Sequence, residues 1–346
     1  MSNQDISSVL IIYTGGTIGM HEDPETGSLK PLNFKEMQKF VPELEQFSIR
    51  IEAEALGTPL DSSDVGVSTW IKLAEIIRDR YNQFDGFVVL HGTDTMAYTS
   101  SALSFMLQNL TKPVVITGSQ LPIGKLRTDG RENLISAIEV AGSQGDNGIA
   151  EVCVMFGSRL MRGNRTHKTD TEDFDGIQSP NFPSLAQVGT HILYKRHLFA
   201  SFDDEFTVHL KMERNVAILK LFPGITQGFV GRILGTPGLR GLILETYGAG
   251  NAPDKVWLHN LLAEAISNGL VVANVTQCAR GFVEQGKYGT SQGLAQCGVL
   301  GSADMTTEAA LTKLMHLLGE ELSPEEVRVR FEKDLFGERT SYSKLA

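Results

Sequence analysis

Four side chains in this chain are of the types that carry out acyl transfer. Two of them, Thr17 and Thr93, each follow a glycine at the end of a short apolar segment. Asp94 and Lys168 add a carboxylate and an ammonium group. A threonine hydroxyl is a weak nucleophile, so it needs a neighbouring group that takes its proton during attack. Because a lysine that is desolvated beside a carboxylate can accept that proton, the four residues together suit attack on an amide or ester carbonyl.

The positions of these residues predict that they meet at one edge of a sheet. Thr17, Ser62 and Thr93 each come after a segment that is expected to form a strand. Parallel strands bring their carboxyl ends to the same edge, and open α/β sheets bind their ligands there. Glycines such as Gly16 and Gly92 allow sharp turns at that edge, and backbone N–H groups in these turns are candidates to hold a developing oxyanion.

Each of these residues also has a structural interpretation, which is the stronger one when the residue is considered alone. Asp94 is placed to cap the helix that is expected directly after it. Lys168 and Ser62 lie in polar runs, where side chains are usually solvated. His91, close to the second threonine, is expected to be a hydrogen-bonded structural residue rather than a base. Only the combination of hydroxyls, carboxylate and lysine indicates chemistry.

Apolar runs alternate with amphipathic stretches along the chain, which predicts an α/β fold with a doubly wound, mostly parallel sheet. In the first half, strands are expected at residues 9–12, 49–53, 86–90, 113–117 and 152–156, and helices at 69–83, 96–110 and 129–141. In the second half, strands are expected at 216–221, 241–245 and 270–275, and helices at 253–269, at 306–318 and from 323 onward. We therefore predict a larger N-terminal catalytic domain over residues 1–195, a linker over 196–213 and a smaller C-terminal α/β domain over 214–346.

The composition limits the classes of protein to which the chain can belong. Its net charge of −10 argues against nucleic-acid and anionic-membrane partners, because binding to phosphate needs concentrated Lys and Arg. The apolar runs have the length of strands, so no membrane span is expected. The N-terminus lacks a basic leader segment, and the three cysteines fit reduced thiols, which predicts a cytoplasmic protein.

Two motifs, at residues 14–19 and 91–96, together resemble the two signature motifs of the bacterial L-asparaginase family. They read TGGTIG and HGTDTM. Residues 60–64, 162–168, 247–253 and 303–306 resemble further blocks of that family, in the same order along nearly the whole chain. Without a signal peptide, the chain is most similar to the cytoplasmic, type I branch.

The resemblance implies a reaction and the residues that perform it. Thr17 corresponds to the threonine that attacks the side-chain amide of L-asparagine, after which ammonia leaves and water releases L-aspartate from an acyl-enzyme. Thr93, Asp94 and Lys168 match the residues that activate the attack. The resemblance implies no metal and no organic cofactor. It implies a small-molecule substrate, L-asparagine, with L-glutamine as an alternative.

The resemblance also assigns substrate-binding positions. Asp94 matches the carboxylate that holds the substrate α-amino group, and Ser62, with Asp61 beside it, matches the group that binds the α-carboxylate. Asn251 matches a segment with which the smaller domain of a neighbouring subunit closes the site, since the family works as homodimers or homotetramers. Holding both ends of a zwitterion positions its amide carbonyl for attack. The predicted substrate-binding residues are Gly16, Asp61, Ser62, Thr93, Asp94 and Asn251.

Other interpretations of the sequence remain open. The main alternative is a non-catalytic amino-acid-binding or regulatory protein on the same scaffold, which would be expected to lack one of the threonines or the lysine. A subunit that supplies ammonia for transamidation of tRNA-bound glutamate is less favoured, because such relatives usually carry an extra N-terminal domain. Residues 289–293 match the nucleophile elbow of serine hydrolases, but the polar residues before them favour a loop.

One departure from the family pattern concerns a tyrosine. Many family members carry a tyrosine in the loop after the first motif, near the nucleophile. This chain has no tyrosine between Tyr13 and Tyr81, and Ser28 or Leu29 falls near the expected place.

Overall fold

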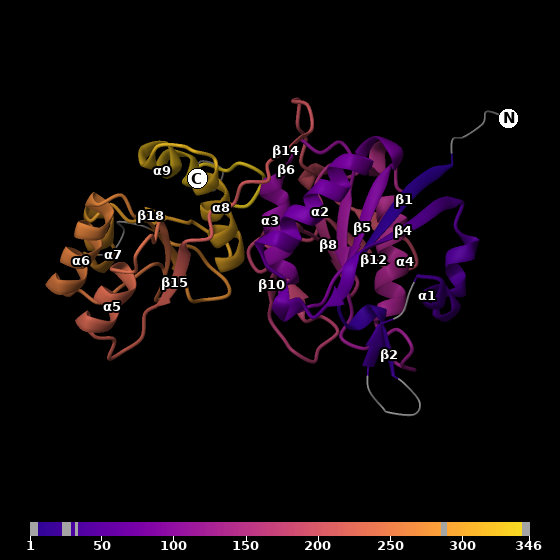
Figure 1. Cartoon of the computed structure of the whole chain (residues 1–346), viewed down its shortest axis with the longest axis horizontal. Coiled ribbons are helices and arrows are strands. Elements are labelled where there is room, and N and C mark those ends of the chain that lie inside the picture. The colour runs from indigo at the N-terminus through magenta and orange to yellow at the C-terminus, as the bar shows by residue number, and fades with distance from the viewer. Residues whose placement is uncertain (1–5, 23–28, 32–33, 285–288, 341–346) are drawn as a thin grey trace. The chain divides into compact units, whose positions relative to one another are not determined.

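The computed structural model describes residues 6–22, 29–31, 34–284 and 289–340. The chain forms two compact units, Met1–Leu210 and Lys211–Ala346, each with its own sheet of wholly or mostly parallel strands (Figure 1). This arrangement confirms the predicted α/β class, with a larger, mostly parallel sheet in the first half and a smaller sheet in the second. The predicted domain bounds, with a linker at 196–213, stay a prediction.

The first unit contains an eight-stranded sheet. Five neighbouring strands run parallel, in the spatial order β8 (Val152–Phe156), β7 (Val114–Thr117), β5 (Gly86–Leu90), β1 (Ser7–Gly15) and β4 (Ile49–Leu60). Three antiparallel strands extend the sheet beyond β8: β9 (Arg159–Arg162), β12 (Ala186–Val188) and β13 (Ile192–Tyr194). A small hairpin of β2 (Met20–Glu22) and β3 (Leu29–Pro31) follows the first turn.

The strand order places a topological switch point at β1. The chain moves from β1 to β4 on one side, then returns to β5 on the other side and continues through β7 to β8. In open α/β sheets the crevice outside the carboxyl ends of the strands at such a point is the usual place for a ligand. Both predicted catalytic threonines follow strands at this point.

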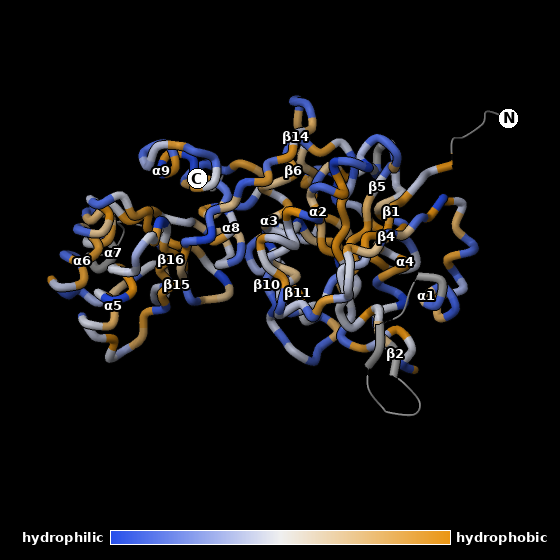
Figure 2. Tube along the Cα trace, viewed as in Figure 1, coloured by the Kyte–Doolittle hydropathy of each residue, from blue (hydrophilic) through white to orange (hydrophobic). Residues whose placement is uncertain are grey.

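Helices cover both faces of the large sheet because each carries an apolar face. Helix α4 (Gly130–Ala141) packs against the face that contains Val9 and Ile11. Helices α2 (Val67–Arg80) and α3 (Met96–Met106) lie on the opposite side (Figure 1). As predicted, α3 is buried nearly all round. Figure 2 shows the most hydrophobic stretches in the strands between these helices. Helix α1 (Phe34–Phe40) lies next to the same core as α4.

The end of α3 differs from the prediction, which extended it to residue 110. The helix ends at Met106, and β6 (Leu107–Gln108) then pairs antiparallel with β14 (Thr207–Val208). Asn109 has a positive φ of 57°, which turns the chain away from the helix axis. A pairing partner about a hundred residues away overrides the helical preference, and a local reading of the sequence does not reveal such a partner.

The second unit repeats the layered arrangement on a smaller scale. Its sheet consists of four parallel strands: β15 (Val216–Lys220), β16 (Gly241–Thr246), β17 (Val271–Thr276) and β18 (Leu300–Gly301). One core lies under α5 (Gln227–Leu234), α6 (Val256–Ser267) and α7 (Gly289–Gln296). A second core lies under α8 (Thr307–Gly319) and α9 (Pro324–Phe331).

Two predictions for the second unit are corrected and one is confirmed. The helix expected to open at Pro253 begins at Val256, and residues 289–293, expected to be a loop, lie in α7. The residues directly before it, 285–288, lie outside the described residues, so the match to the nucleophile-elbow pattern is not tested. The predicted capping box of α9 is present, with Ser323 and Glu326 exchanging hydrogen bonds. Across the described ranges, no helix is long and apolar enough to cross a bilayer.

Candidate active site

The first signature motif forms a turn that only glycine can make. Gly15 and Gly16 have φ values of 131° and 84°, a region that side chains disfavour. A Cβ atom on Gly15 would lie 2.1 Å from the carbonyl oxygen of Leu60 on the neighbouring strand. This turn leads directly into a 3₁₀ helix, Thr17–Gly19, so that the half-buried Thr17 stands just beyond the end of β1.

Three turns that are far apart in sequence meet at this point. A Cβ atom on Gly16 would lie 2.4 Å from the backbone nitrogen of Gly92, and one on Gly92 would lie 2.5 Å from Oγ of Ser62. The backbones after β1 and β5 are therefore in direct contact, with the Ser62 side chain packed against Gly92. Thr17 and Thr93 each follow one of the two touching glycines, so the predicted convergence of the strand ends is found.

Lys168 joins this group through its ammonium nitrogen. Nζ of Lys168 donates to Oγ1 of Thr93 at 2.8 Å and to Oδ1 of Asp94 at 2.6 Å. The lysine side chain is 17% exposed, whereas that of Asp94 is 62% exposed. The lysine is therefore largely desolvated, while the carboxylate faces the solvent. The predicted threonine, carboxylate and lysine are in direct contact.

Packing between α3 and the segment before Lys168 explains how the lysine reaches the site. The hydroxyls of Ser100 and Thr166 both donate to the carbonyl oxygen of Gly163, each at 2.8 Å. A Cβ atom on Gly163 would approach the Ser100 side chain to 3.2 Å, so small residues allow this close contact. The chain then continues into β10 (His167–Lys168), which pairs with β11 (Ile177–Gln178).

The Ser62 turn is tied to the second motif. Oγ1 of Thr95 donates to the carbonyl oxygen of Ser62 at 2.7 Å. Asp61 caps the 3₁₀ helix Ser62–Asp64, because its carboxylate accepts hydrogen bonds from the N–H and the hydroxyl of Ser63, both at 2.8 Å. These two bonds hold the pKa of the exposed Asp61 carboxyl below its usual value.

Two predicted positions are engaged elsewhere. The N–H of Gly16 donates to the carbonyl oxygen of Leu60 at 3.2 Å, so it is not free to bind an oxyanion. Asn251 belongs to the second unit, where its backbone forms a bridge with Tyr247. The role of Asn251 in the site stays a prediction.

Gln120 is a site residue that the sequence analysis did not select. Its Oε1 lies 3.5 Å from Oγ1 of Thr93, and its Nε2 donates to the carbonyl oxygen of Asp173 at 2.9 Å. Gln120 follows β7, the strand next to β5, so its position at a strand end was the available signal. Its side chain links the second threonine to the turn between β10 and β11.

His91 is fully buried and hydrogen-bonded on both ring nitrogens, as expected for a structural residue. Burial lowers its pKa from 6.5 to about 4, so the imidazole is neutral at physiological pH. It is therefore a residue of the framework behind the second motif.

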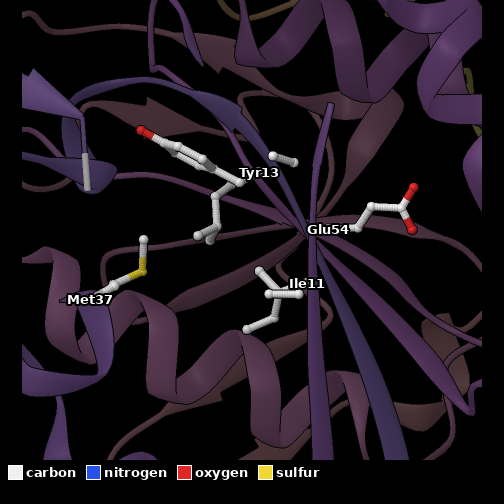
Figure 3. Close-up of a pocket in the computed structure, with 7 residues that line it drawn as sticks. Ile11, Tyr13, Met37 and Glu54 are labelled. Carbon is white, nitrogen blue, oxygen red and sulfur yellow. The ribbon is translucent and has the colours of Figure 1, made fainter. Parts of the chain in front are cut away.

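A separate cavity of about 160 Å³ lies beside Tyr13, on the sheet face that also contacts α1. In Figure 3, Ile11, Tyr13 and Met37 surround this space, and the carboxylate of Glu54 points away from it. Its walls are mostly apolar, and none of the predicted site residues lines it. The cavity lacks the charged groups that an amino acid requires, so the site at the strand ends remains the candidate.

Matches to known families follow the same two-unit division. Residues 8–199 match the family model described as "Asparaginase, N-terminal", and residues 215–331 match the "Glutaminase/Asparaginase C-terminal domain". The chain belongs to the asparaginase family.

Curated relatives and solved structures match nearly the whole of this chain. The chain is 44% identical to "L-asparaginase 1" of Escherichia coli (strain K12), over 96% of this chain and 98% of the relative. It is 40% identical to the "60 kDa lysophospholipase" of Mus musculus, of which it spans 62%. The crystal structure of L-asparaginase I from Vibrio cholerae superposes with a TM-score of 0.87 at 39% identity, covering 97% of this chain and 99% of that one.

The chain lacks the tyrosine that many family members carry in the loop after the first motif. Ser28 lies outside the described residues. Tyr13, in the strand before the first motif, donates its hydroxyl to the carbonyl oxygen of Gly19 at 3.0 Å. Burial raises the pKa of Tyr13 to about 12, which keeps its proton in place. Tyr13 therefore supports the turn that carries Thr17.

Within the described residues, no group of three or more His, Cys, Asp or Glu side chains is placed to hold a metal ion.

Proposed function

We propose that this asparaginase-family protein hydrolyses L-asparagine to L-aspartate and ammonia, with Thr17 as the nucleophile and an acyl-enzyme as the intermediate. The observation that carries the proposal is the position of the Lys168 ammonium group between the hydroxyl of Thr93 and the carboxylate of Asp94. A lysine that is only 17% exposed and touches a hydroxyl is the arrangement that proton transfer requires.

In the proposed first step, Oγ1 of Thr17 attacks the side-chain amide carbon of asparagine. Its proton passes through Thr93 to Lys168 in the neutral form of the lysine, over the 2.8 Å contact between them. Asp94 stabilises the ammonium form that results. The Lys168 ammonium group returns this proton through Thr93 to the amide nitrogen, and the C–N bond breaks to release ammonia. Water then attacks the ester carbonyl, which releases L-aspartate and restores the Thr17 hydroxyl.

The two ends of the substrate meet groups of opposite character. Oδ1 of Asp94 accepts from Lys168, and the carboxylate is exposed enough to accept from the substrate α-ammonium group as well. The buried hydroxyl of Ser62, at the same strand edge, is the proposed donor to the α-carboxylate. Fixing both ends orients the amide toward Thr17.

The assembly and location of the protein also belong to this proposal. We expect a cytoplasmic homodimer or homotetramer in which Asn251 of a neighbouring subunit completes the site. L-Glutamine is the competing substrate, since one methylene discriminates by only about 1–3 kcal/mol.

A non-catalytic binding protein is the alternative on this scaffold. Binding an amino acid requires Ser62 and Asp94, but it does not require a lysine placed on the hydroxyl of Thr93. The retained contact between Lys168 and Thr93 therefore favours an enzyme.

Release of ammonia from L-asparagine tests the proposal, with L-glutamine in parallel. We expect Thr17→Ala, Thr93→Val and Lys168→Met each to lose activity by about 10³-fold, the usual cost of removing a group that acts in the transition state. Lys125→Met, at an exposed lysine, is the matched control and should keep full activity. Mass spectrometry of the quenched reaction should find the acyl group on the peptide that contains Thr17. An inactive wild type that still binds asparagine would establish the alternative, and an active Thr17→Ala would exclude this nucleophile.

A further inference from the structure

A chain of three buried side chains runs from the two helices on one face of the sheet to the second signature motif. Nε1 of Trp70 in α2 lies 3.0 Å from Oγ1 of Thr99 in α3. The same Oγ1 lies 3.0 Å from Nε2 of His91, and Nδ1 of His91 lies 2.7 Å from the carbonyl oxygen of Gly92. Trp70 is 6% exposed, and Thr99 and His91 are 0% exposed.

The chemistry of the groups fixes the direction of every bond in this chain. An indole N–H only donates, so Oγ1 of Thr99 accepts from Trp70. A carbonyl oxygen only accepts, so Nδ1 of His91 donates to the carbonyl oxygen of Gly92. The neutral imidazole then has no hydrogen on Nε2, which accepts the single hydroxyl hydrogen of Thr99.

This last hydrogen bond orients the peptide between Gly92 and Thr93. The C=O and N–H groups of a trans peptide point in opposite directions. Because the Gly92 carbonyl is held toward the buried imidazole, the N–H of Thr93 points away from the core, toward the strand edge. An N–H group in this position is placed to donate to the oxygen of a substrate amide as negative charge develops there.

The same peptide carries the Thr93 side chain, whose Oγ1 must stay 2.8 Å from Nζ of Lys168. Contacts with Gly16 and Ser62 already fix the position of Gly92. Rotation of the peptide plane is the freedom that they leave, and the hydrogen bond from His91 removes it.

We propose that Trp70, Thr99 and His91 form a positioning relay that locks the Gly92–Thr93 peptide, so that the Thr93 N–H serves as an oxyanion donor and the Thr93 hydroxyl stays on Lys168. This inference rests on the proposed asparagine hydrolysis. None of the three side chains touches the reacting atoms, so all three are positioning residues.

Matched pairs of variants at Thr99 test the relay. Thr99→Val has nearly the same shape but neither accepts from Trp70 nor donates to His91, whereas Thr99→Ser keeps both bonds. We expect kcat for asparagine to fall about tenfold in Thr99→Val with KM changed less than about twofold, because the lost interaction acts in the transition state. Thr99→Ser should restore kcat to within about twofold of the wild-type value. Equal kcat values in Thr99→Val and Thr99→Ser, or a change in KM alone, would overturn the relay.

A second pair of variants removes the donor itself. The amide of His91→Asn can donate to the Gly92 carbonyl from nearly the same place as Nδ1, and His91→Leu cannot. We expect His91→Leu to lose about 10²-fold in kcat, and His91→Asn to keep at least about a tenth of the wild-type value. If His91→Leu fails to fold, the Thr99 pair still decides the question.

A spectroscopic readout separates this inference from the proposed function. In ¹⁵N spectra of the labelled protein, the histidine signal absent from His91→Asn should show a protonated Nδ1 and an unprotonated Nε2 between pH 5.5 and 8. The opposite tautomer would overturn the relay even in an active enzyme. A wild type that releases no ammonia but shows the expected tautomer would contradict the proposed function and the catalytic part of the relay, and would leave the hydrogen-bond chain as framework.

Discussion

Each unit of this protein contains a lysine paired with a carboxylate, and the two pairs have opposite surroundings. In the first unit, the Lys168 side chain is 17% exposed and that of its partner Asp94 is 62% exposed. In the second unit, Lys313 of α8 pairs with Glu338, and both side chains are 0% exposed. Both pairs join a lysine to a carboxylate, one from aspartate and one from glutamate, and they differ chiefly in what surrounds them.

The pair in the second unit is saturated by structural partners. Nζ of Lys313 also donates to the carbonyl oxygen of Lys333, and the Glu338 carboxylate accepts from the N–H groups of Leu335 and Phe336. Burial lowers the pKa of Lys313. Burial alone would raise the pKa of Glu338, but the lysine and the backbone donors outweigh it and hold that pKa below its usual value. The pair fastens the residues after α9 to α8.

The lysine and carboxylate of the first unit have different partners. Besides Asp94, the Lys168 ammonium group contacts the hydroxyl of Thr93, a group that can exchange a proton, and Asp94 is open to solvent. The proposed catalytic role of Lys168 therefore depends on a hydroxyl partner and an exposed carboxylate, whereas backbone groups hold the Lys313–Glu338 pair.

The largest expected effect comes from removing each lysine in turn. We expect Lys168→Met to lower kcat by about 10³-fold and to leave the free energy of unfolding within about 1 kcal/mol. Lys313→Met should lower the free energy of unfolding by about 3–5 kcal/mol, because an unpaired carboxylate stays buried. Its kcat per folded molecule should be unchanged. Ammonia release and denaturant unfolding measure the two quantities.

A double variant in each unit serves as the control for that contrast. Lys313→Met combined with Glu338→Leu should regain most of the lost stability, because no charge remains buried. Lys168→Met combined with Asp94→Leu should regain no activity. Recovery of activity in the first unit, or none of stability in the second, would contradict the comparison.

The next largest effect concerns His91, a titratable group behind the second motif that is as fully buried as Lys313. Burial holds the pKa of His91 at about 4, whereas the unfolded chain has the ordinary value of 6.5. Between these values the unfolded chain binds a proton that the folded protein cannot bind. The free energy of unfolding should therefore fall by about 2 kcal/mol through His91 as the pH drops from 7.5 to 5.

Denaturant unfolding of wild type and His91→Asn at the two pH values measures this contribution. The variant has no group that titrates there, so its loss of stability between pH 7.5 and 5 should be smaller by about 2 kcal/mol. Identical pH dependence in the two proteins would show that His91 is not held neutral by burial.

The smallest expected effect tests how Lys168 is delivered to its partners. Ser100→Ala removes one of the two hydroxyls that hold the Gly163 carbonyl. We expect a loss of about 1 kcal/mol in stability and about a fivefold lower kcat, since the segment before Lys168 loosens. Ser104→Ala is the matched control, because its hydroxyl donates within α3, to the carbonyl oxygen of Ser100. An equal kcat in the two variants would exclude a role for this contact.

Much of this architecture could be predicted from the sequence because the local signals agree with the fold. The apolar runs before Thr17 and Thr93 end at glycines, and the parallel-strand rule then brings both threonines to one edge. The contact of Lys168 with Thr93 and Asp94 followed from the same reasoning, with the motif resemblance as support.

What could not be predicted depends on long-range contacts. The end of α3 at Met106 is set by pairing of β6 with β14, and the contact of Gln120 with Thr93 depends on β7 being the strand that pairs with β5. The buried pair of Lys313 and Glu338 was not predicted, because neither residue belongs to a motif. Burial is a property of the folded chain, and a charged residue in a helix or tail is usually exposed.

The glycine contact behind the two threonines has a consequence for attempts to change what this enzyme accepts. Even a methyl group at Gly16 or Gly92 would collide with backbone atoms or with Ser62, so randomised libraries at these positions would return mostly misfolded clones. Gln120 and the turn between β10 and β11 are connected to Thr93 through a side chain, so we expect them to tolerate replacement better. We therefore expect substitutions at Gly16 and Gly92 to be rejected, and changes in substrate preference to come from Gln120 and the turn between β10 and β11.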